Sequence, residues 1–577
     1  MGTMDSFVPP FGLGKLAIPD NLNINISRTT VFFLLPTALL LTWYITTVTI
    51  QYYRLRHIPG PFLNAITPLV LTYHSLKGDI TEYTYEIARK YGPLARLQPN
   101  MVVYTDPDTF RRICSYKAGY TKGLWFEFSR WDLNSYSCIA MRDNPRRKDR
   151  KNRIAPAWAS GGLAKMETRV DKTVHSFLDL IERNYISSEP KDKSTAARPY
   201  GRPMDFGVRS MMFTLDVATS VTFGKAWGFL ESDSDVNEYL STSEKMLPSF
   251  GVLGSLPWLV YVMHAWPINL LMPGPGDRVG FGCLMKFATD QVNKRIEAIN
   301  SKSDPEKEAP NKKDNVDELD IIRSYLNNGI PYADVVQETI TLVVAGTETT
   351  AVAFKFALLS LLTTPSAYNK LQSEIDAYYS SHPSASPDDI VPYSAFKATS
   401  SNPEDISPAS STNSFSYLLA ILRETLRLWP PSAGLFSKQV PDQGDTIHGL
   451  YLPPGTEIGQ CMLGMGRHPS IFGTDEEDVK SFRPERWSEA AEQDRIDGGN
   501  RFEKMASTVE LVFSTGKYVC LGKHVALMEL GKFFVEVLRR YDISIVDKIT
   551  PIKVRDPIVW LAKDFNIRFT RRDISTQ

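Results

Sequence analysis

The sequence lacks the cysteine and histidine patterns that build disulfide frameworks or protein-only metal sites. Its five cysteines, at 114, 138, 283, 461 and 520, are odd in number and widely spaced, and no CxxC pair occurs. The eight histidines form no HExxH motif. We therefore expect neither a disulfide framework nor a metal held by protein ligands alone, and the cysteine usage favours a reducing compartment.

An excess of charge of one sign is also missing. Lys and Arg total 65 and Asp and Glu total 65, so nothing indicates binding to nucleic acid or another polyanion. No internal repeat is visible, and no flavin or nicotinamide fingerprint occurs. With 43% hydrophobic and 23% charged residues, the composition is that of an ordinary globular protein with ample core.

One long hydrophobic run is present near the N-terminus. Thr29–Ile50 contains 22 uncharged residues, which is long enough to cross a bilayer. A cleaved signal peptide is the alternative, but its basic start, short apolar core and small-residue cleavage site are not evident. More basic residues follow the run (Arg54, Arg56, His57) than precede it (Lys15, Arg28). This asymmetry predicts an anchor with the bulk of the chain in the cytosol.

The sequence predicts four parts. Residues 1–28 form a short lumenal N-terminus whose sequon at Asn25 lies too near the membrane for use, and 29–50 form the anchor. Residues 51–64 form a hinge around Pro59-Gly60-Pro61, and 65–577 a single domain. Polar stretches predict surface loops at 187–203, 301–317 and 381–416, the last with a mobile Ser/Pro-rich insertion at about 398–414.

Periodicity predicts a mainly α fold with small β-sheets. Helical patterns cover 211–221, 285–299, 333–362, 368–379, 418–428 and 525–541, and strand-like runs lie at 94–103, 446–452 and 567–570.

A glycine-rich segment surrounds the last cysteine. Phe513 to Gly522 reads FSTGKYVCLG, and a helical pattern follows it. A lone cysteine is ordinarily a small buried hydrophobe. Glycines before and after Cys520 permit a tight turn and close approach of the backbone to a flat ligand. A thiolate there could hold a haem iron and favour oxygen activation over oxygen carriage.

Two other segments carry polar residues in apolar surroundings. Glu424 and Arg427 are three residues apart on a helical pattern with apolar flanks, so they can pair on one face, and Arg486 is a candidate third member. Upstream, Ala345–Thr350 (AGTETT) interrupts a long apolar helix, which predicts a local bulge there.

Together these motifs resemble the cytochrome P450 family over nearly the whole chain after the anchor. The matching pieces are the AGxET-T stretch at 345–350, ExxR at 424–427, PERW at 484–487 and FxxGxxxCxG at 513–522. The resemblance is nearest to fungal members of the pisatin demethylase or benzoate hydroxylase type, on VTFGKAWGFL within 206–230, NKLQSEID at 369–376 and GKYVCLGKHVA at 516–526.

The resemblance implies residue roles. Cys520 would be the axial ligand of haem b iron, with Phe513 beside it and the backbone of Gly516, Lys517 and Gly522 moderating the thiolate. The triad of Glu424, Arg427 and Arg486 would hold the haem-binding loop. Thr349 and Glu348 would lie over the distal face and relay protons, with Gly346 leaving room for oxygen. The alternative for Thr349 is a hydroxyl bonded to its own i−4 carbonyl. Pocket walls would come from 120–134, 249–271, 432–436 and 557–561.

The chain departs from the family pattern beside the cysteine. Where the family commonly has Arg or His two residues before it, this chain has Tyr518, so the usual cation for a haem propionate is missing. Lys438, after the ExxR helix, and Lys151, in the basic run 146–153, are the candidate replacements. That run is either a solvated face or a docking surface for an acidic redox partner.

The function implied is a monooxygenase at the endoplasmic reticulum membrane that oxidises a lipophilic small molecule of fungal secondary metabolism. Electrons would come from NADPH through a separate cytochrome P450 reductase, with cytochrome b5 as an additional donor. The alternatives are a reductase-independent isomerase or dehydratase acting on a peroxide, and a non-catalytic haem-binding membrane protein. The Glu348-Thr349 pair argues against the first, because such chemistry needs no proton relay.

Overall fold

The computed structural model describes residues 28–132, 135–186, 201–302, 321–384, 386, 388–396, 414–432, 434–473 and 475–572. The three predicted polar loops and the insertion at about 398–414 fall largely outside these residues, as does the N-terminal segment with Asn25. The chain divides into two compact units, Met1–Gln51 and Tyr52–Gln577, and each is described by itself.

The first unit contributes most of helix α1 (Arg28–Leu55), which continues through Pro36 without a break. The stretch Leu34–Leu55 is long and apolar enough to cross a membrane, and none of its apolar window is buried. The helix extends five residues beyond the predicted anchor, to Leu55, and α2 already begins at Phe62. The predicted hinge at 51–64 is therefore non-helical only at 56–61.

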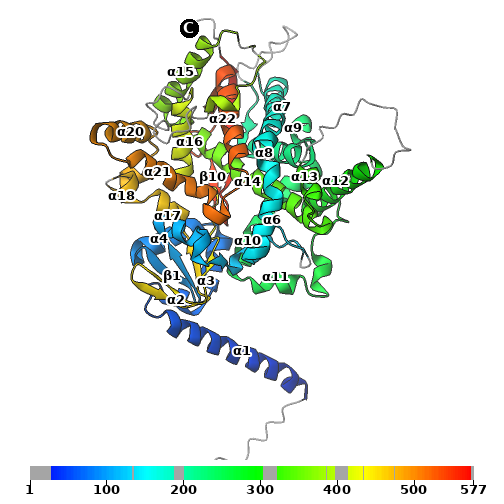
Figure 1. Ribbon diagram of the computed structural model, residues 1–577, viewed down its shortest axis with the longest axis vertical. Coiled ribbons are helices and arrows are strands. Elements are labelled where there is room, and N and C mark those ends of the chain that lie inside the picture. Colours follow the sequence, from blue (N-terminus) through cyan, green and yellow to red (C-terminus); the bar gives the residue numbers. More distant parts are fainter. Residues whose placement is uncertain are drawn as a thin grey trace, which may run out of the picture. The chain divides into compact units, whose positions relative to one another are not determined.

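Helices dominate the second unit, as predicted, and the long helix α14 (Tyr332–Thr363) lies near its centre between α8 (Phe206–Phe223) and the pair α16 (Ser416–Leu428) and α22 (Lys523–Arg540) (Figure 1). α14 is also long and apolar enough to cross a membrane, but two-thirds of its most apolar stretch is buried. A helix that is apolar on nearly every face and buried is typical of a protein core. The other α-helices are α3 (Leu69–Lys77), α4 (Ile80–Tyr91), α5 (Pro107–Cys114), α6 (Asn144–Ile154), α7 (Ser160–Asn184), α9 (Phe229–Ser232), α10 (Tyr239–Ser255), α11 (Trp258–Met263), α12 (Gly280–Lys302), α13 (Ile321–Asn327), α15 (Pro365–Ser381), α17 (Met462–Gly466), α18 (Pro469–Phe472), α19 (Glu476–Lys480), α20 (Glu485–Asp497) and α21 (Arg501–Val509), and α2 ends at Ile66.

Four small sheets complete the fold of the described residues. The largest has the order β1-β2-β8-β5-β3, and in Figure 1 its blue strands from around residue 100 lie beside yellow strands from beyond residue 430. β2 and β8 run parallel, with Val102 opposite Ile458, and the other pairs are antiparallel. The strands are β1 (Leu94–Gln98), β2 (Met101–Tyr104), β3 (Thr121–Lys122), β4 (Met204–Asp205), β5 (Lys438–Gln439), β6 (Asp445–Ile447), β7 (Leu450–Leu452), β8 (Glu457–Gln460), β9 (Tyr541–Ile545), β10 (Lys553–Arg555), β11 (Leu561–Lys563) and β12 (Asn566–Arg571).

Two sequence predictions are corrected by the fold. The runs at 94–103 and 446–452 are hairpins of two short strands each, because turns at 99–100 and 448–449 interrupt them. The predicted bulge at 345–350 is wrong, since α14 is an unbroken α-helix from Tyr332 to Thr363. The hydroxyls of Thr347 and Thr349 each donate to the carbonyl four residues earlier, so these polar residues are accommodated within regular helix.

Candidate functional site

The loop before α22 carries Cys520 at its end. Two short 3-10 helices, η8 (Glu510–Phe513) and η9 (Gly516–Tyr518), lead to it, and the Cys520 amide donates to the Phe513 carbonyl at 2.8 Å. Gly516 adopts φ +55°, and a Cβ there would lie 2.5 Å from the Cys114 carbonyl oxygen. Glycine is therefore required at 516 both for its backbone conformation and for its close approach to α5.

The Cys520 thiol faces the start of α22. Backbone N–H groups of Gly522 and Lys523 are directed at its sulfur and lower the pKa of the thiol, whereas burial, the larger effect, raises it. The residue is nevertheless accessible to solvent. A Cβ at Gly522 would lie 3.9 Å from the sulfur, so glycine keeps that approach open. A thiol that has many neighbours but remains accessible, and that lies at the N-terminus of a helix, is suited to binding a metal ion.

Cations gather around Tyr518, two residues before the cysteine. The guanidinium carbon of Arg147 lies 4.5 Å from the centroid of its ring and Nζ of Lys438 lies 4.8 Å from it. Nζ of Lys517 and Nζ of Lys122 lie 5.2 Å and 6.0 Å away. Lys151 on α6 approaches from the same side and donates to the Lys517 carbonyl at 3.1 Å.

These cations contact only carbonyl oxygens, side-chain amides and aromatic faces. Lys122 Nζ donates to the carbonyls of Cys138 and Ile139, and Lys438 Nζ to that of Phe436. Within the part of the chain that the structure describes, none of the five has a carboxylate within 4.0 Å. Burial, with a smaller contribution from the charge of Arg147, lowers the pKa of Lys122 to about 7 and that of Lys438 to about 8. Buried cations without an anion are unfavourable, so this cluster is suited to binding one.

Lys151 and Lys438 were predicted from the sequence as replacements for the missing cation, and both lie in this cluster. Arg147 and Lys122 were missed. Arg147 is four residues before Lys151 and shares its helix face, a spacing that could have indicated it. Lys122 has no comparable sequence signal, because strand pairing in the tertiary fold brings it there.

The basic run at 146–153 is divided by α6 into two faces. Arg147 and Arg150 are buried, and Arg150 pairs with Asp334 and with Glu338 of α14. Arg146, Lys148 and Arg153 remain exposed. Neither alternative predicted for the whole run therefore describes it fully, because two of its six basic residues, Arg147 and Arg150, are buried.

Glu424, Arg427 and Arg486 meet in a fully buried network. Arg427 donates twice to the Glu424 carboxylate, at 2.9 and 2.7 Å, and Nε of Arg486 donates to it at 2.8 Å. Nε1 of Trp487 and the amide of Arg483 complete the set of donors. One carboxylate thus receives five hydrogen bonds, which satisfies the arginine charges away from water.

The same two arginines hold the chain that follows α17. Arg427 Nη1 donates to the Gly466 carbonyl at 2.9 Å, and Nη2 to the Ser481 carbonyl at 3.0 Å. Arg486 Nη2 donates to the Asp478 carbonyl at 2.8 Å. The network fastens α16 to the segment 466–487, which leads through α20 and α21 to η8. No hydrogen bond of its described members reaches the loop 513–522 itself.

Thr349 and Glu348 lie on different faces of α14. The Thr349 hydroxyl donates to the Ala345 carbonyl at 2.7 Å, which is the i−4 hydrogen bond predicted as the alternative for this residue. Glu348 is buried, and its Oε2 atom has no hydrogen-bond partner among the described residues. Burial raises the pKa of Glu348, the charge of Lys355 opposes that rise, and Glu244 adds to it. The two side chains make no direct hydrogen bond to each other in the described structure.

Gly346 lies at the contact between α14 and α8. A Cβ at 346 would make an ordinary contact, 3.6 Å from Cβ of Ala218 on α8. Nearby, Thr214 Oγ1 of α8 donates to the Thr347 carbonyl at 3.0 Å. Packing against α8 therefore does not require glycine at 346, and the room it would leave for oxygen stays a prediction.

Three of the four predicted pocket walls contact one another through aromatic rings, and the fourth, 557–561, is hydrogen-bonded to 432–436. Phe128 lies 5.9 Å from Phe250 and 6.3 Å from Phe436 between ring centroids, and Trp131 lies 5.4 Å from Phe250. The Gly434 amide donates to the Ile558 carbonyl at 2.9 Å. Trp131 Nε1 reaches Thr341 of α14 at 3.4 Å. Segments distant in sequence therefore converge on the N-terminal half of α14 as an apolar, aromatic group.

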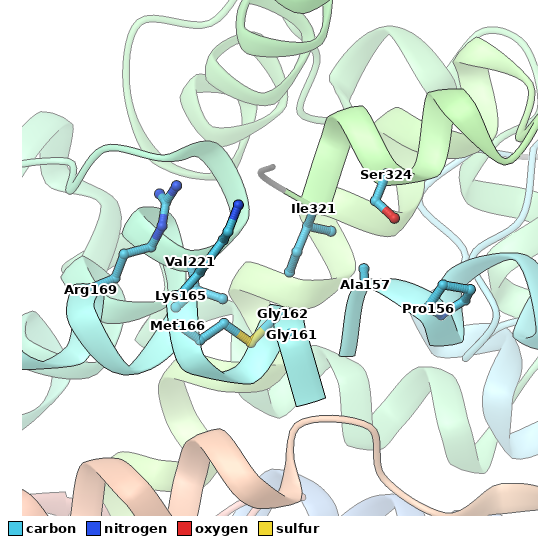
Figure 2. A pocket seen from close by; sticks show the side chains of 10 residues that line it. All are labelled: Pro156, Ala157, Gly161, Gly162, Lys165, Met166, Arg169, Val221, Ile321 and Ser324. Atoms are coloured by element: carbon cyan, nitrogen blue, oxygen red, sulfur yellow. The ribbon is translucent and has the colours of Figure 1, made fainter. Parts of the chain in front are cut away.

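A separate cavity of about 80 Å³ lies between η3 (Ala155–Trp158), the start of α7, the end of α8 and α13 (Figure 2). Its lining includes Lys165, Arg169 and Ser324 but none of the predicted site residues. Arg169 donates to the Ser220 carbonyl at 2.5 Å, so its guanidinium binds carbonyls at the end of α8. The cavity has room for a few water molecules only.

Comparison with known proteins agrees with this geometry. The sequence model of the cytochrome P450 family matches residues 59–569. Cytochrome P450 monooxygenase ABA1 of Pyricularia oryzae is 31% identical over 540 residues, which cover 93% of this chain and 96% of that protein. Cytochrome P450 monooxygenase aba1 of Botryotinia fuckeliana is 28% identical, covering 90% and 92%. Cytochrome P450 monooxygenase abl1 of Leptosphaeria maculans is 27% identical, covering 91% and 84%.

The chain belongs to the cytochrome P450 family and is a monooxygenase of that class. The family carries a haem whose iron is held by a thiolate. The residues present fit that group: Cys520 offers an accessible thiol, and the cluster of five cations beside it matches the acidic edge of a haem.

Proposed function

We propose that this protein is a membrane-anchored haem-thiolate monooxygenase that oxidises a lipophilic small molecule with electrons delivered from NADPH by a separate reductase. The observation that carries the proposal is the accessible Cys520 thiol at the start of α22 beside a buried cation cluster with no described carboxylate partner. The fungal relatives named as cytochrome P450 monooxygenases support an oxidation. We propose hydroxylation or O-demethylation as the outcome, in secondary metabolism.

The proposal assigns roles to residues of the Cys520 loop and to the residues around it. When bound, the haem supplies oxygen activation, which the thiolate of Cys520 favours by donating electron density to iron. The amides of Gly522 and Lys523 moderate that thiolate, and Phe513 lies beside the loop. The cations that would hold the propionates, where the family commonly has Arg or His at the position of Tyr518, are Lys122, Arg147, Lys151, Lys438 and Lys517. The Glu424–Arg427–Arg486 network fixes the segment that leads into the loop.

Proton delivery is assigned to α14. Glu348 takes protons from solvent and passes them toward Thr349. The Thr349 hydroxyl donates to the Ala345 carbonyl, and its oxygen keeps lone pairs that can accept a hydrogen bond in the proton path toward the haem. Because the two side chains do not bond directly, water connects them in this proposal.

Exposed cations, the apolar helix and an aromatic group each favour one partner in this proposal. The exposed cations Arg146, Lys148 and Arg153 offer a positive face for an acidic redox protein, NADPH-cytochrome P450 reductase, with cytochrome b5 as a further donor. In this proposal the apolar helix Leu34–Leu55 is the anchor, and the basic residues that follow the apolar stretch favour residues 65–577 on the cytosolic side of the endoplasmic reticulum. The aromatic group of Phe128, Trp131, Phe250 and Phe436 favours an apolar substrate.

The test of haem ligation is spectroscopic. Reduced protein with carbon monoxide is expected to absorb at the position typical of thiolate-ligated haem, and Cys520→Ala is expected to lose that signal. Cys283→Ser, a half-buried thiol on α12, is the matched control and should keep it. Wild-type protein from haem-replete cells with no Soret band would disprove the proposal.

The relay is tested by coupling. With reductase and a substrate found by comparing metabolites of deletion and parent strains, Thr349→Ala should consume NADPH while releasing peroxide in place of product. Coupling equal to that of wild type would place the proton path elsewhere. Turnover without reductase would instead support the peroxide-rearranging alternative.

A further inference from the structure

A buried lysine lies on the same helix as the proposed proton relay. Lys355 is 1% exposed and sits seven residues after Glu348, which is 5% exposed. Residues seven apart on an α-helix share a face, and a long helical side chain points back toward the N-terminus, here toward Glu348. Among the described residues, Lys355 has no ion pair within 4.0 Å. An ammonium and a carboxylate are thus both kept from water without bonding each other.

The groups around this pair come from two further elements, β4 and α10. Asp205, at the end of β4, and Glu244, on α10, act electrostatically on Lys355, and Glu244 also acts on Glu348. Tyr239 of α10 is buried and close enough for the charge of Glu348 to raise its pKa, although burial is the larger cause. Asp205 itself caps α8 through the Val208 amide. Lys355 is therefore the one cation that acts on Glu348 among these described groups.

Glu244 connects the buried pair to the surface. Its carboxylate forms a close ion pair with Lys563 of β11, whose side chain is 55% exposed, whereas that of Glu244 is 31% exposed. Solvent ions and protons can reach Glu244, and its charge acts on both buried groups. One ion pair and these electrostatic interactions thus relate the surface residue Lys563 to Glu244, and Glu244 to Lys355 and Glu348 of α14.

We infer that Lys355 is a positioning residue that, through its buried positive charge, sets how tightly Glu348 holds a proton. The inference rests on the proposed role of Glu348 in the relay. Because opposite charge favours the ionised carboxylate, Lys355 offsets part of the burial that would keep Glu348 neutral, and Glu348 can then alternate between carboxylate and acid. The function of the ammonium is electrostatic, and no bond to substrate or haem is required of it.

The experiment is an infrared titration of the carboxyl group in the haem-loaded full chain. The carbonyl band of protonated Glu348 is identified as the one lost in Glu348→Gln, and its midpoint pH is measured in each variant. Lys355→Met removes the charge but keeps a side chain of similar length, and the midpoint should move up by about one pH unit, a tenfold change in proton affinity. Lys355→Arg keeps the charge and should restore the wild-type midpoint.

Glu244→Gln provides a change in the opposite direction. Its charge raises the pKa of Glu348, so its removal should lower the midpoint, and its partly exposed position makes misfolding unlikely to confuse the result. A midpoint that stays at the wild-type value in Lys355→Met would overturn the inference. If Lys355→Met loses its fold, Lys355→Gln removes the same charge with a polar side chain and decides it.

The relay and this inference fail separately. If Glu348→Gln leaves coupling unchanged, the relay is wrong, whatever the midpoints show. If Glu348→Gln uncouples NADPH use from product but Lys355→Met moves neither the midpoint nor the pH dependence of coupling, the inference is wrong and the relay stands. In a Glu348→Gln background, Lys355→Met should have no further effect on coupling, because the lysine acts only through the carboxylate.

Discussion

Lys122 and Lys438 are direct cross-strand partners in the β3–β5 ladder. Both are buried, and their ammonium groups lie 4.7 and 5.1 Å from the same ring, that of Phe126. Like charges directly opposite each other destabilise a sheet, and burial increases that cost. The arrangement becomes favourable when an anion lies between the strands and the Cys520 loop, which is the place proposed for the haem propionates.

The first prediction concerns haem retention. Lys122→Met and Lys438→Met should each release haem to an excess of apomyoglobin about ten to a hundred times faster than wild type, because each removes a charged hydrogen bond worth about 1.5–3 kcal/mol. Lys148→Met, an exposed cation of the same basic region, is the control and should match wild type. Equal release from all three variants would contradict the assignment.

The second prediction is the pH dependence of that release. Lys122 and Lys438 have pKa values lowered to about 7 and about 8 by burial, and a bound anion raises them again. Binding therefore takes up protons at pH values above these pKa values. Retention should be full below pH 7 and should weaken as the pH rises through 7 and 8. Release rates measured from pH 6 to pH 9 check this, and the slope should flatten in Lys122→Met; a slope unchanged from wild type would count against it.

A third prediction separates the buried carboxylate network from a surface ion pair. Glu424→Gln leaves two buried arginine charges without their anion, so unfolding free energy should fall by about 3–5 kcal/mol, and haem content should fall with it. Glu489→Gln removes an exposed partner of Arg483 and should cost less than about 1 kcal/mol. Chemical denaturation of the two variants measures the difference. Similar losses would show that the network is not what stabilises this region.

The fourth prediction concerns the turn before the cysteine. Gly516→Ala places a Cβ 2.5 Å from the Cys114 carbonyl and forces alanine into the left-handed region, so we expect destabilisation of at least about 1 kcal/mol and a weaker carbon monoxide signal. Gly161→Ala, on α7 with nothing within 4 Å, is the control and should be neutral or stabilising. Melting curves with matched spectra distinguish the outcomes.

Much of the site could be read from the sequence because its members are local. The FxxGxxxCxG loop, ExxR and the helix at 333–362 each lie within one short stretch, so spacing and apolar periodicity reveal them. Glu424 and Arg427 are one helical turn apart, and their pairing follows from helix geometry alone. The family resemblance carried by the same stretches extends over residues 59–569.

Sequence spacing could not predict the tertiary contacts of these residues. Lys122 meets Lys438 only because β3 and β5 pair, and Arg150 turns inward only because α14 places Asp334 and Glu338 beside it. The predicted bulge was wrong because side-chain hydroxyls can bond within a regular helix. Sequence determined which chemical groups the protein has and where each lies along its elements. Tertiary structure decided which charges are buried together, because burial and pairing depend on contacts between segments hundreds of residues apart.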